Sequence, residues 1–158
     1  MKFPLRRVVT GHDEQGRARV RFDDISSHLV SKRAGHNSFV VWTTRGHPVD
    51  NSSAEDASLV PVGTELKNGT VFRIMKLDPG VMPRRHRTNS IDYLVVLSGA
   101  VSMELDEETV DLRAGDVLVQ RGTVHNWVNK GTEPCIMAVV LISATPVRVT
   151  DQVLEAHG

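Results

Sequence analysis

The stretch that decides the fold is residues 80–99, GVMPRRHRTNSIDYLVVLSG. It opens on the glycine of a Pro-Gly turn and ends in a hydrophobic run closed by a second glycine. Between the two, His86, Thr88 and Asp92 stand at even spacings. Side chains two residues apart share a face of extended backbone, so all three are expected to point toward one interior. A histidine and a carboxylate that face inward are either part of a site or a costly burial of polar groups.

Composition limits the function classes. The chain has 158 residues, enough for one domain with a real core. Its 19 lysines and arginines balance its 19 aspartates and glutamates. A nucleic-acid surface would need a clustered basic excess, so no nucleic-acid partner is expected. The single cysteine excludes an internal disulfide. Without a signal peptide or an apolar run of about 20 residues, the expected location is the cytoplasm, with no membrane partner.

Short runs rich in β-branched residues recur along the chain and indicate an all-β sandwich or barrel. Residues 5–10 and 18–22 read as a hairpin. Residues 23–37 are polar with no clean period, and they are expected to form a loop. The later strands are expected at residues 39–44, 70–77, 92–98, 100–105, 109–112, 117–120, 125–129 and 135–143.

The second informative stretch is residues 115–129, GDVLVQRGTVHNWVN. Together the two stretches resemble the motifs of the cupins, G-x5-H-x-H-x3/4-E-x6-G and G-x5-P-x-G-x2-H-x3-N. The residues that fall on the first motif, with every spacing kept, are Gly80, His86, Thr88, Asp92 and Gly99. Those that fall on the second are Gly115, Gly122, His125 and Asn129.

This resemblance implies an all-β, single-domain cupin jelly-roll β-barrel with extra N-terminal strands. Residues 1–68 would supply N-terminal strands and loops packed on the barrel. Residues 69–145 would form the cupin domain, and 146–158 a C-terminal tail with one short strand and a frayed end. Small cupins are commonly dimers, so a homodimer is expected.

A narrower resemblance rests on RRVVTGHDE at 6–14, the Trp42 strand and QRGTVHNW at 120–127. These segments look like a group of small single-domain bacterial cupins. Fungal relatives of that group occur in polyketide gene clusters, where they are described as oxidoreductases or dehydratases.

The departures from the cupin motifs bear on metal binding. In metal-binding cupins the two histidines and the glutamate of the first motif join the histidine of the second around one divalent ion. Here Thr88 replaces a histidine and Asp92 replaces the glutamate, and a threonine hydroxyl is a poor ligand for Fe, Mn, Ni or Zn. His86, Asp92 and His125 remain as a set of two imidazoles and one carboxylate, which suits such an ion. The alternative is a metal-free polar pocket in which Asp92 pairs with His86 or an arginine.

Three further residues are candidates for substrate binding. Arg84 shares parity with His86 and would either anchor an anionic substrate or lie solvated at the rim. Thr88 shares the same face. Trp127 shares parity with His125 and would either form a wall for a substrate ring or simply fill the core. The other histidines stand in expected loops without ligand spacing, and no role is assigned to them: His12, His28, His36 and His47.

Two function classes follow. The first is a small-molecule enzyme acting in the barrel pocket on a small organic, cyclic or polyketide-like substrate. As an oxidoreductase or lyase it would use a metal as Lewis acid or oxygen activator; as a dehydratase or isomerase it would move a proton with His125 and Asp92. The second is a non-catalytic module that holds a small ligand without a metal.

Overall fold

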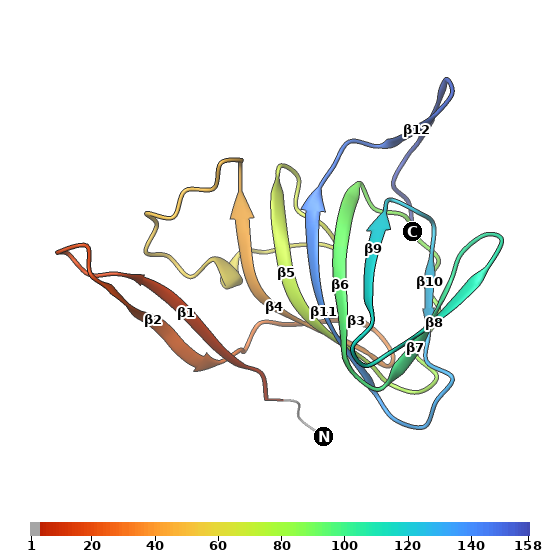
Figure 1. Ribbon diagram of the computed structural model, residues 1–158, viewed down its shortest axis with the longest axis horizontal. Helices are drawn as coiled ribbons and strands as arrows, with labels where there is room; N and C mark the ends of the chain where they lie inside the picture. Colours follow the sequence, from red (N-terminus) through yellow and green to blue (C-terminus); the bar gives the residue numbers. More distant parts are fainter. Residues whose placement is uncertain (1–3) are drawn as a thin grey trace.

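The computed structural model describes residues 4–158, and the side chains of all of these except Lys32 (Figure 1). Within this range, no helix is both long and apolar enough to cross a membrane. Apart from a 3-10 turn at Ala57–Leu59, the regular elements there are strands: β1 (Arg6–His12), β2 (Ala18–Ile25), β3 (Leu29–Arg33), β4 (His36–Arg45), β5 (Gly69–Leu77), β6 (Ser90–Ser98), β7 (Ala100–Glu104), β8 (Thr109–Arg113), β9 (Val117–Arg121), β10 (Asn126–Val128), β11 (Cys135–Ser143), β12 (Val147–Val149) and β13 (Gln152–Leu154).

Two antiparallel sheets form the body of the molecule. The larger has the strand order β3-β4-β5-β11-β6-β9, and the smaller has the order β10-β7-β8. In the described chain no strand ladder joins the two sheets, so the closed jelly-roll barrel expected above is wrong. The chain passes from β6 to β7 through Gly99, and this tight turn redirects it out of the larger sheet. The result is an open arrangement of two sheets, which Figure 1 shows as a curved layer with β7, β8 and β10 at one side.

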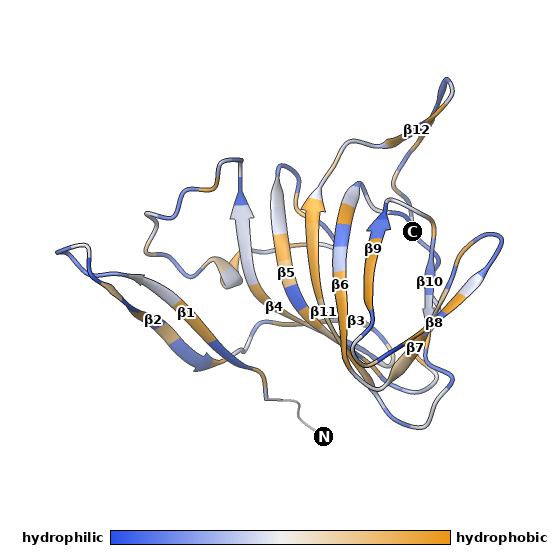
Figure 2. Cartoon of the chain, in the orientation of Figure 1, coloured by the Kyte–Doolittle hydropathy of each residue, from blue (hydrophilic) through white to orange (hydrophobic). Residues whose placement is uncertain are grey.

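The inner face of the larger sheet carries the core. Buried and partly exposed residues alternate along β5, β6 and β11, as expected for strands with one face inward. Figure 2 shows these strands as the most hydrophobic part of the ribbon. The alternation places Arg73 of β5 between Val71 and Met75 on the buried face, where Val139 of β11 lies opposite it. A charged side chain therefore stands inside the core layer.

The β1–β2 hairpin stands beside β4 (Figure 1). The Phe22 ring lies 6.3 Å from that of Trp42 on β4, and the Arg7 guanidinium donates to Asp56 at 2.7 Å. The hairpin is thus tied to the body by a buried arginine and an aromatic contact.

Two segments differ from expectation. Within residues 23–37, expected as a loop, β2 continues to Ile25 and β3 pairs with β4 through Leu29 opposite Phe39 and Val30 opposite Ser38. β3 is an edge strand of five residues, and so short a segment offers too few positions for a period-2 pattern to be recognised. For the C-terminal tail, the sequence predicts one short strand with a frayed end. β12 matches that strand, but the chain continues into β13, and His157 then exchanges backbone hydrogen bonds of 3.1 and 2.9 Å with Arg87.

Candidate active site

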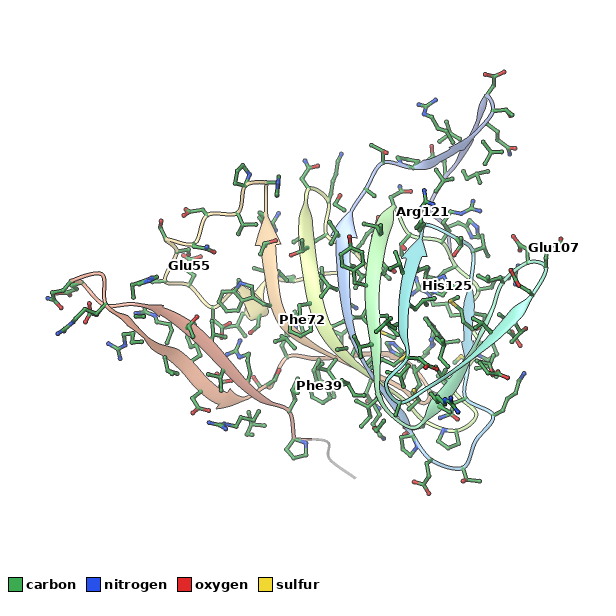
Figure 3. All side chains as sticks on the ribbon, in the orientation of Figure 1. Phe39, Glu55, Phe72, Glu107, Arg121 and His125 are labelled. Carbon is green, nitrogen blue, oxygen red and sulfur yellow. The ribbon has the colours of Figure 1, made fainter. Side chains whose placement is uncertain are left out.

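The inner face of the larger sheet and the segments around residues 84–88 and 122–127 enclose a cavity of about 240 Å³. The structure places every residue predicted for the site at its wall: Arg84, His86, Thr88, Asp92, His125 and Trp127. The motif spacing thus brings together residues that are 43 positions apart at the extremes, Arg84 and Trp127. Figure 3 shows His125 beside β9 and β10.

The two histidines are positioned by a single β-bridge between their backbones. The His86 amide donates to the His125 carbonyl at 3.1 Å, and the His125 amide donates back at 3.0 Å. Directly paired residues of antiparallel strands project to the same side. The imidazole rings accordingly lie side by side, with centroids 4.3 Å apart.

Backbone carbonyls determine the tautomer of both rings. Nδ1 of His86 lies 3.0 Å from the Arg84 carbonyl, and Nδ1 of His125 lies 3.1 Å from the Thr123 carbonyl. A carbonyl only accepts, so Nδ1 donates in each ring and Nε2 keeps its lone pair. The Gln120 Nε2 atom lies 2.7 Å from the same His125 nitrogen. Since Nδ1 already donates to the Thr123 carbonyl, we assign the Gln120 amide the flipped orientation, in which its oxygen faces the ring and accepts.

Both imidazoles are neutral at ordinary pH. Burial lowers the pKa of His86 to about 3, and the neighbouring His125 adds to this effect. Burial also lowers the pKa of His125 to about 4. The site therefore presents two imidazoles whose Nε2 atoms accept hydrogen bonds and which do not carry positive charge.

Asp92 is the carboxylate of the cavity. Burial raises its pKa to about 6, the Glu65 charge raises it further, and Ser90 and Arg73 oppose the shift. The Ser90 hydroxyl lies 2.6 Å from Asp92 Oδ1 and 2.9 Å from the Thr88 hydroxyl. Because Ser90 has one hydroxyl proton, it donates to Asp92, and Thr88 completes the chain by donating to Ser90. Thr88 thus acts on the orientation of Asp92 through Ser90.

The predicted metal ligands do not converge. Among residues 4–158, no three side chains of His, Cys, Asp or Glu are grouped as a metal ion requires. Asp92 is engaged with Ser90, and Thr88 stands where a third imidazole would complete the set. The residues present therefore do not fit a three-ligand ion in this conformation, although the Nδ1 hydrogen bonds of both histidines resemble those of metal ligands. From this geometry we expect little bound metal, and elemental analysis tests that expectation.

The predicted binding residues have different surroundings. Trp127 is 4% exposed and meets the His125 ring edge-on at 5.7 Å, so it is both core and cavity wall. The Arg84 guanidinium donates to the Thr64 hydroxyl at 3.2 Å and to the main-chain oxygen of Gly158 at 2.5 Å. Both side chains line the cavity, while Asn129, which shares their predicted face, instead holds the backbone at Leu77 and Glu133.

The sequence reasoning missed several polar cavity residues, among them Thr64, Gln120 and the three basic residues Arg33, His36 and Arg73. Arg73 had a usable signal, because it shares strand parity with Val71 and Met75, which are typical core residues. Arg33 and His36 lie in the stretch expected as a loop, and nothing in its pattern indicated that it turns back toward the cavity.

The two facing sheets with a polar cavity define an all-β protein of the double-stranded β-helix class. The model of the family described as "Cupin domain" matches residues 73–142. The Cupin-domain-containing oxidoreductase fogC of Aspergillus ruber is 37% identical over 162 residues, covering 96% of this chain and 78% of that relative. Phomopsin biosynthesis cluster protein C' of Diaporthe leptostromiformis is 34% identical, covering 94% and 83%.

A solved structure supports the fold. An uncharacterised protein with a double-stranded β-helix domain from Klebsiella pneumoniae superposes with a TM-score of 0.51 at 19% identity, covering 74% of this chain and 84% of that chain. At this identity the likeness concerns the fold alone. The family match and the relatives establish that this chain belongs to the cupin family, as the two motifs predicted.

Proposed function

We propose that this protein is a small-molecule enzyme that transfers a proton within its cavity. The observation that carries the proposal is the placement of a buried, hydrogen-bonded carboxylate, Asp92, in the same small cavity as two imidazoles with free Nε2 atoms. The raised pKa of Asp92, about 6, supports it, because a general base works best when its pKa is near the operating pH.

The proposed step begins with a substrate carbonyl group near the cavity arginines. The Asp92 carboxylate takes a proton from the carbon next to that carbonyl, and the electron pair of the C–H bond forms an enolate. A nearby guanidinium such as Arg73 stabilises the enolate oxygen. Asp92 then returns the proton either to another carbon, which gives an isomer, or to a leaving hydroxyl, which departs as water.

The remaining residues orient this step. Ser90 holds the Asp92 oxygen that it hydrogen bonds, so the other oxygen faces the substrate. The Nε2 atoms of His86 and His125 accept hydrogen bonds from substrate hydroxyls, and Trp127 excludes water from one wall. Enolate formation is a step shared by many dehydratases and isomerases. The fungal relative is named an oxidoreductase, whereas the step proposed here involves no change of oxidation state.

The substrate is proposed to be a small organic molecule, since about 240 Å³ holds roughly eight water-sized groups. The names of the relatives, one of them a biosynthesis cluster protein, favour an intermediate of secondary metabolism. If Fe, Mn, Ni or Zn were bound, it would act as a Lewis acid for the carbonyl. No part of the step above depends on it.

Solvent deuterium incorporation tests the proposal. Small cyclic and acyclic ketones and β-hydroxyketones are incubated with the protein in D₂O, and exchange next to the carbonyl is followed by NMR. We expect exchange above the buffer rate for some of them. Asp92→Asn should lower it by about 100-fold or more, because it removes the base. Asp151→Asn, a change of the same kind at an exposed turn residue, should leave it unaltered.

His125→Ala tests whether His125 positions the substrate, provided that the variant still folds. We expect most of the exchange activity to be lost, because a hydroxyl acceptor is removed, while circular dichroism shows an intact fold. Exchange that is equal in wild type, Asp92→Asn and His125→Ala would contradict the proton-transfer function. Binding of panel compounds without any exchange would favour the non-catalytic binding module.

A further inference from the structure

Three guanidinium groups line the cavity from three separate parts of the chain. Arg33 comes from the end of β3, Arg73 from the middle of β5, and Arg84 from the segment before His86. Within the described part of the chain, no Asp or Glu carboxylate forms an ion pair with any of them, whereas arginines elsewhere, such as Arg7 and Arg85, do form ion pairs. Arg84 instead donates to the main-chain oxygen of Gly158, and Arg73 interacts with Asp92 only through its electrostatic field. The cavity therefore gathers guanidinium groups without a side-chain ion pair.

Hydrogen-bonding capacity is also left over. Arg73 is only 6% exposed, and it donates to the carbonyls of Gly63 and Thr64 at 3.1 and 2.9 Å while its buried Nε has no partner. The buried Nε of Arg33 and Nδ1 of His36 also lack partners. Leaving a buried donor unpaired costs about 1–3 kcal/mol. These groups lie around one cavity, so a single ligand can satisfy several of them.

The acidic groups nearby do not neutralise this charge. Asp92 is the carboxylate of the cavity wall, and its oxygen is held by Ser90. Glu65 acts electrostatically on Asp92, and one of its own oxygens is buried without a partner. With both acids ionised, the three guanidinium groups still outnumber the Asp and Glu carboxylates at the cavity, and one of them, Arg84, also donates to the Gly158 main-chain oxygen. Burial lowers the pKa of Arg33 and of His36, and neighbouring arginines lower both further.

The rest of the cavity lining is largely apolar: Met75, Leu94, Trp127, Val139 and Leu141, all of which are buried. Val139 is the cross-strand partner of both Arg73 and Leu94, so cationic and apolar side chains adjoin on the inner face of the larger sheet. A compact inorganic anion would leave the apolar surface unfilled. A ligand that matches the whole lining has both an anionic group and an apolar body.

The geometry points to an organic carboxylate as the ligand of this cavity, with its carboxylate held by the arginines and a ring-sized apolar body against Trp127. Planar guanidinium groups match the two oxygens of a carboxylate better than a point charge does. The inference rests on the proposed function for the identity of this cavity as the substrate site. It adds the substrate class: a carboxylic acid carrying the carbonyl at which Asp92 acts.

Equilibrium binding tests it without requiring turnover. Titration calorimetry at pH 7.5 compares benzoate, its neutral counterpart benzamide, and inorganic phosphate. We expect benzoate to bind at least about tenfold more tightly than either, since one charge-assisted hydrogen bond contributes about that factor. Equal affinity for benzamide would overturn the charge requirement. Tighter binding of phosphate would overturn the carboxylate class.

Variants locate the binding. Arg33→Gln and Arg84→Gln, both at partly exposed side chains, should each weaken benzoate binding about tenfold or more. Arg121→Gln, at an exposed residue of β9 outside the cavity wall, should change it less than about twofold. Unchanged affinity in the two cavity variants would refute the site.

The outcomes remain separable from those of the exchange experiment. Benzoate binding that depends on the arginines, together with no deuterium exchange in any ketone, would support the anion site and refute the proton-transfer function. Deuterium exchange that depends on Asp92, without a preference for benzoate over benzamide, would support the proton-transfer function and refute the anion site.

Discussion

Asp92 lies where burial favours the protonated acid, while His86 and His125 lie where burial favours the neutral base. The same physical cause, loss of water around a charge, therefore moves the pKa of the acid up and those of the imidazoles down. For the proposed reaction near neutral pH, this favours the carboxyl over the histidines as the group that exchanges a proton with the substrate. This assigns the acid–base role to Asp92 more specifically than the sequence did, where His125 shared it.

Asp92→Asn is expected to stabilise the protein at high pH. The folded pKa of Asp92, about 6, exceeds the unfolded value of about 4, so the unfolded state loses the proton first. Folding stability therefore falls as pH rises from about 4 and levels off above about 6. Urea unfolding should show the variant about 2 kcal/mol more stable than wild type at pH 8, and no more stable at pH 4. A gain that is equal at both pH values would contradict the assigned burial of the charge.

At the scale of elements, the turn between β6 and β7 is the most constrained connection around the site. Gly99 has φ of 74°, and a Cβ added there would lie 2.5 Å from the Pro134 carbonyl oxygen. Gly115 has φ of 93°, and nothing lies within 4 Å of its added Cβ. Both glycines have a positive φ, but neighbouring backbone lies close only to Gly99. Gly115 is therefore a control for the effect of the close contact at Gly99.

Gly99→Ala should lower the free energy of unfolding by about 3 kcal/mol or more, because backbone strain and a backbone clash add. Gly115→Ala should cost only about 1 kcal/mol, from the positive φ alone. Urea denaturation measures both. Equal losses would mean that the close approach of residues 134–135 has no energetic weight.

The elements also show how far sequence reasoning reached. Motif spacing predicted that His86, Thr88, Asp92 and His125 surround one cavity, because spacing on extended backbone determines the face of each side chain. It did not predict β3, whose pairing with β4 depends on a neighbour rather than on its own pattern. Because β3 was not predicted, Arg33 and His36, at the junction of β3 and β4, were not predicted as cavity residues either. The open edge between the sheets was missed because motif spacing carries no information on ladders between sheets.

At the scale of the whole molecule, the metal prediction has a direct measurement. Since His86, Asp92 and His125 do not converge, we expect protein purified without chelator to contain less than about a tenth of an equivalent of Fe, Mn, Ni or Zn. Elemental analysis by mass spectrometry decides this. Close to one equivalent, lost in His86→Ala and retained in His47→Ala, would show that the three donors regroup around an ion.

The predicted homodimer also belongs to this scale. β9 is an edge strand of the larger sheet. The outer face of β6 and β9 exposes five large apolar side chains: Tyr93, Val95, Leu97, Val117 and Val119. An exposed apolar edge of this kind favours pairing with a second copy. Light scattering after gel filtration should give a dimer for wild type and a monomer for Val119→Lys. Val149→Lys, at an exposed valine of β12, should stay dimeric. A monomeric wild type would refute the prediction.

The bridge between His86 and His125 has a kinetic consequence. Each of these two backbone amides donates to the other residue's carbonyl, and the pair belongs to no longer ladder. Opening that separates the segments frees both protons at once, so the two amides should show one common protection factor against exchange with solvent. That factor reports local opening of the cavity rather than global unfolding. A ligand seated between the imidazoles and the arginines would raise it by the factor by which the ligand stabilises the closed form, so these two protons report the occupancy of the cavity.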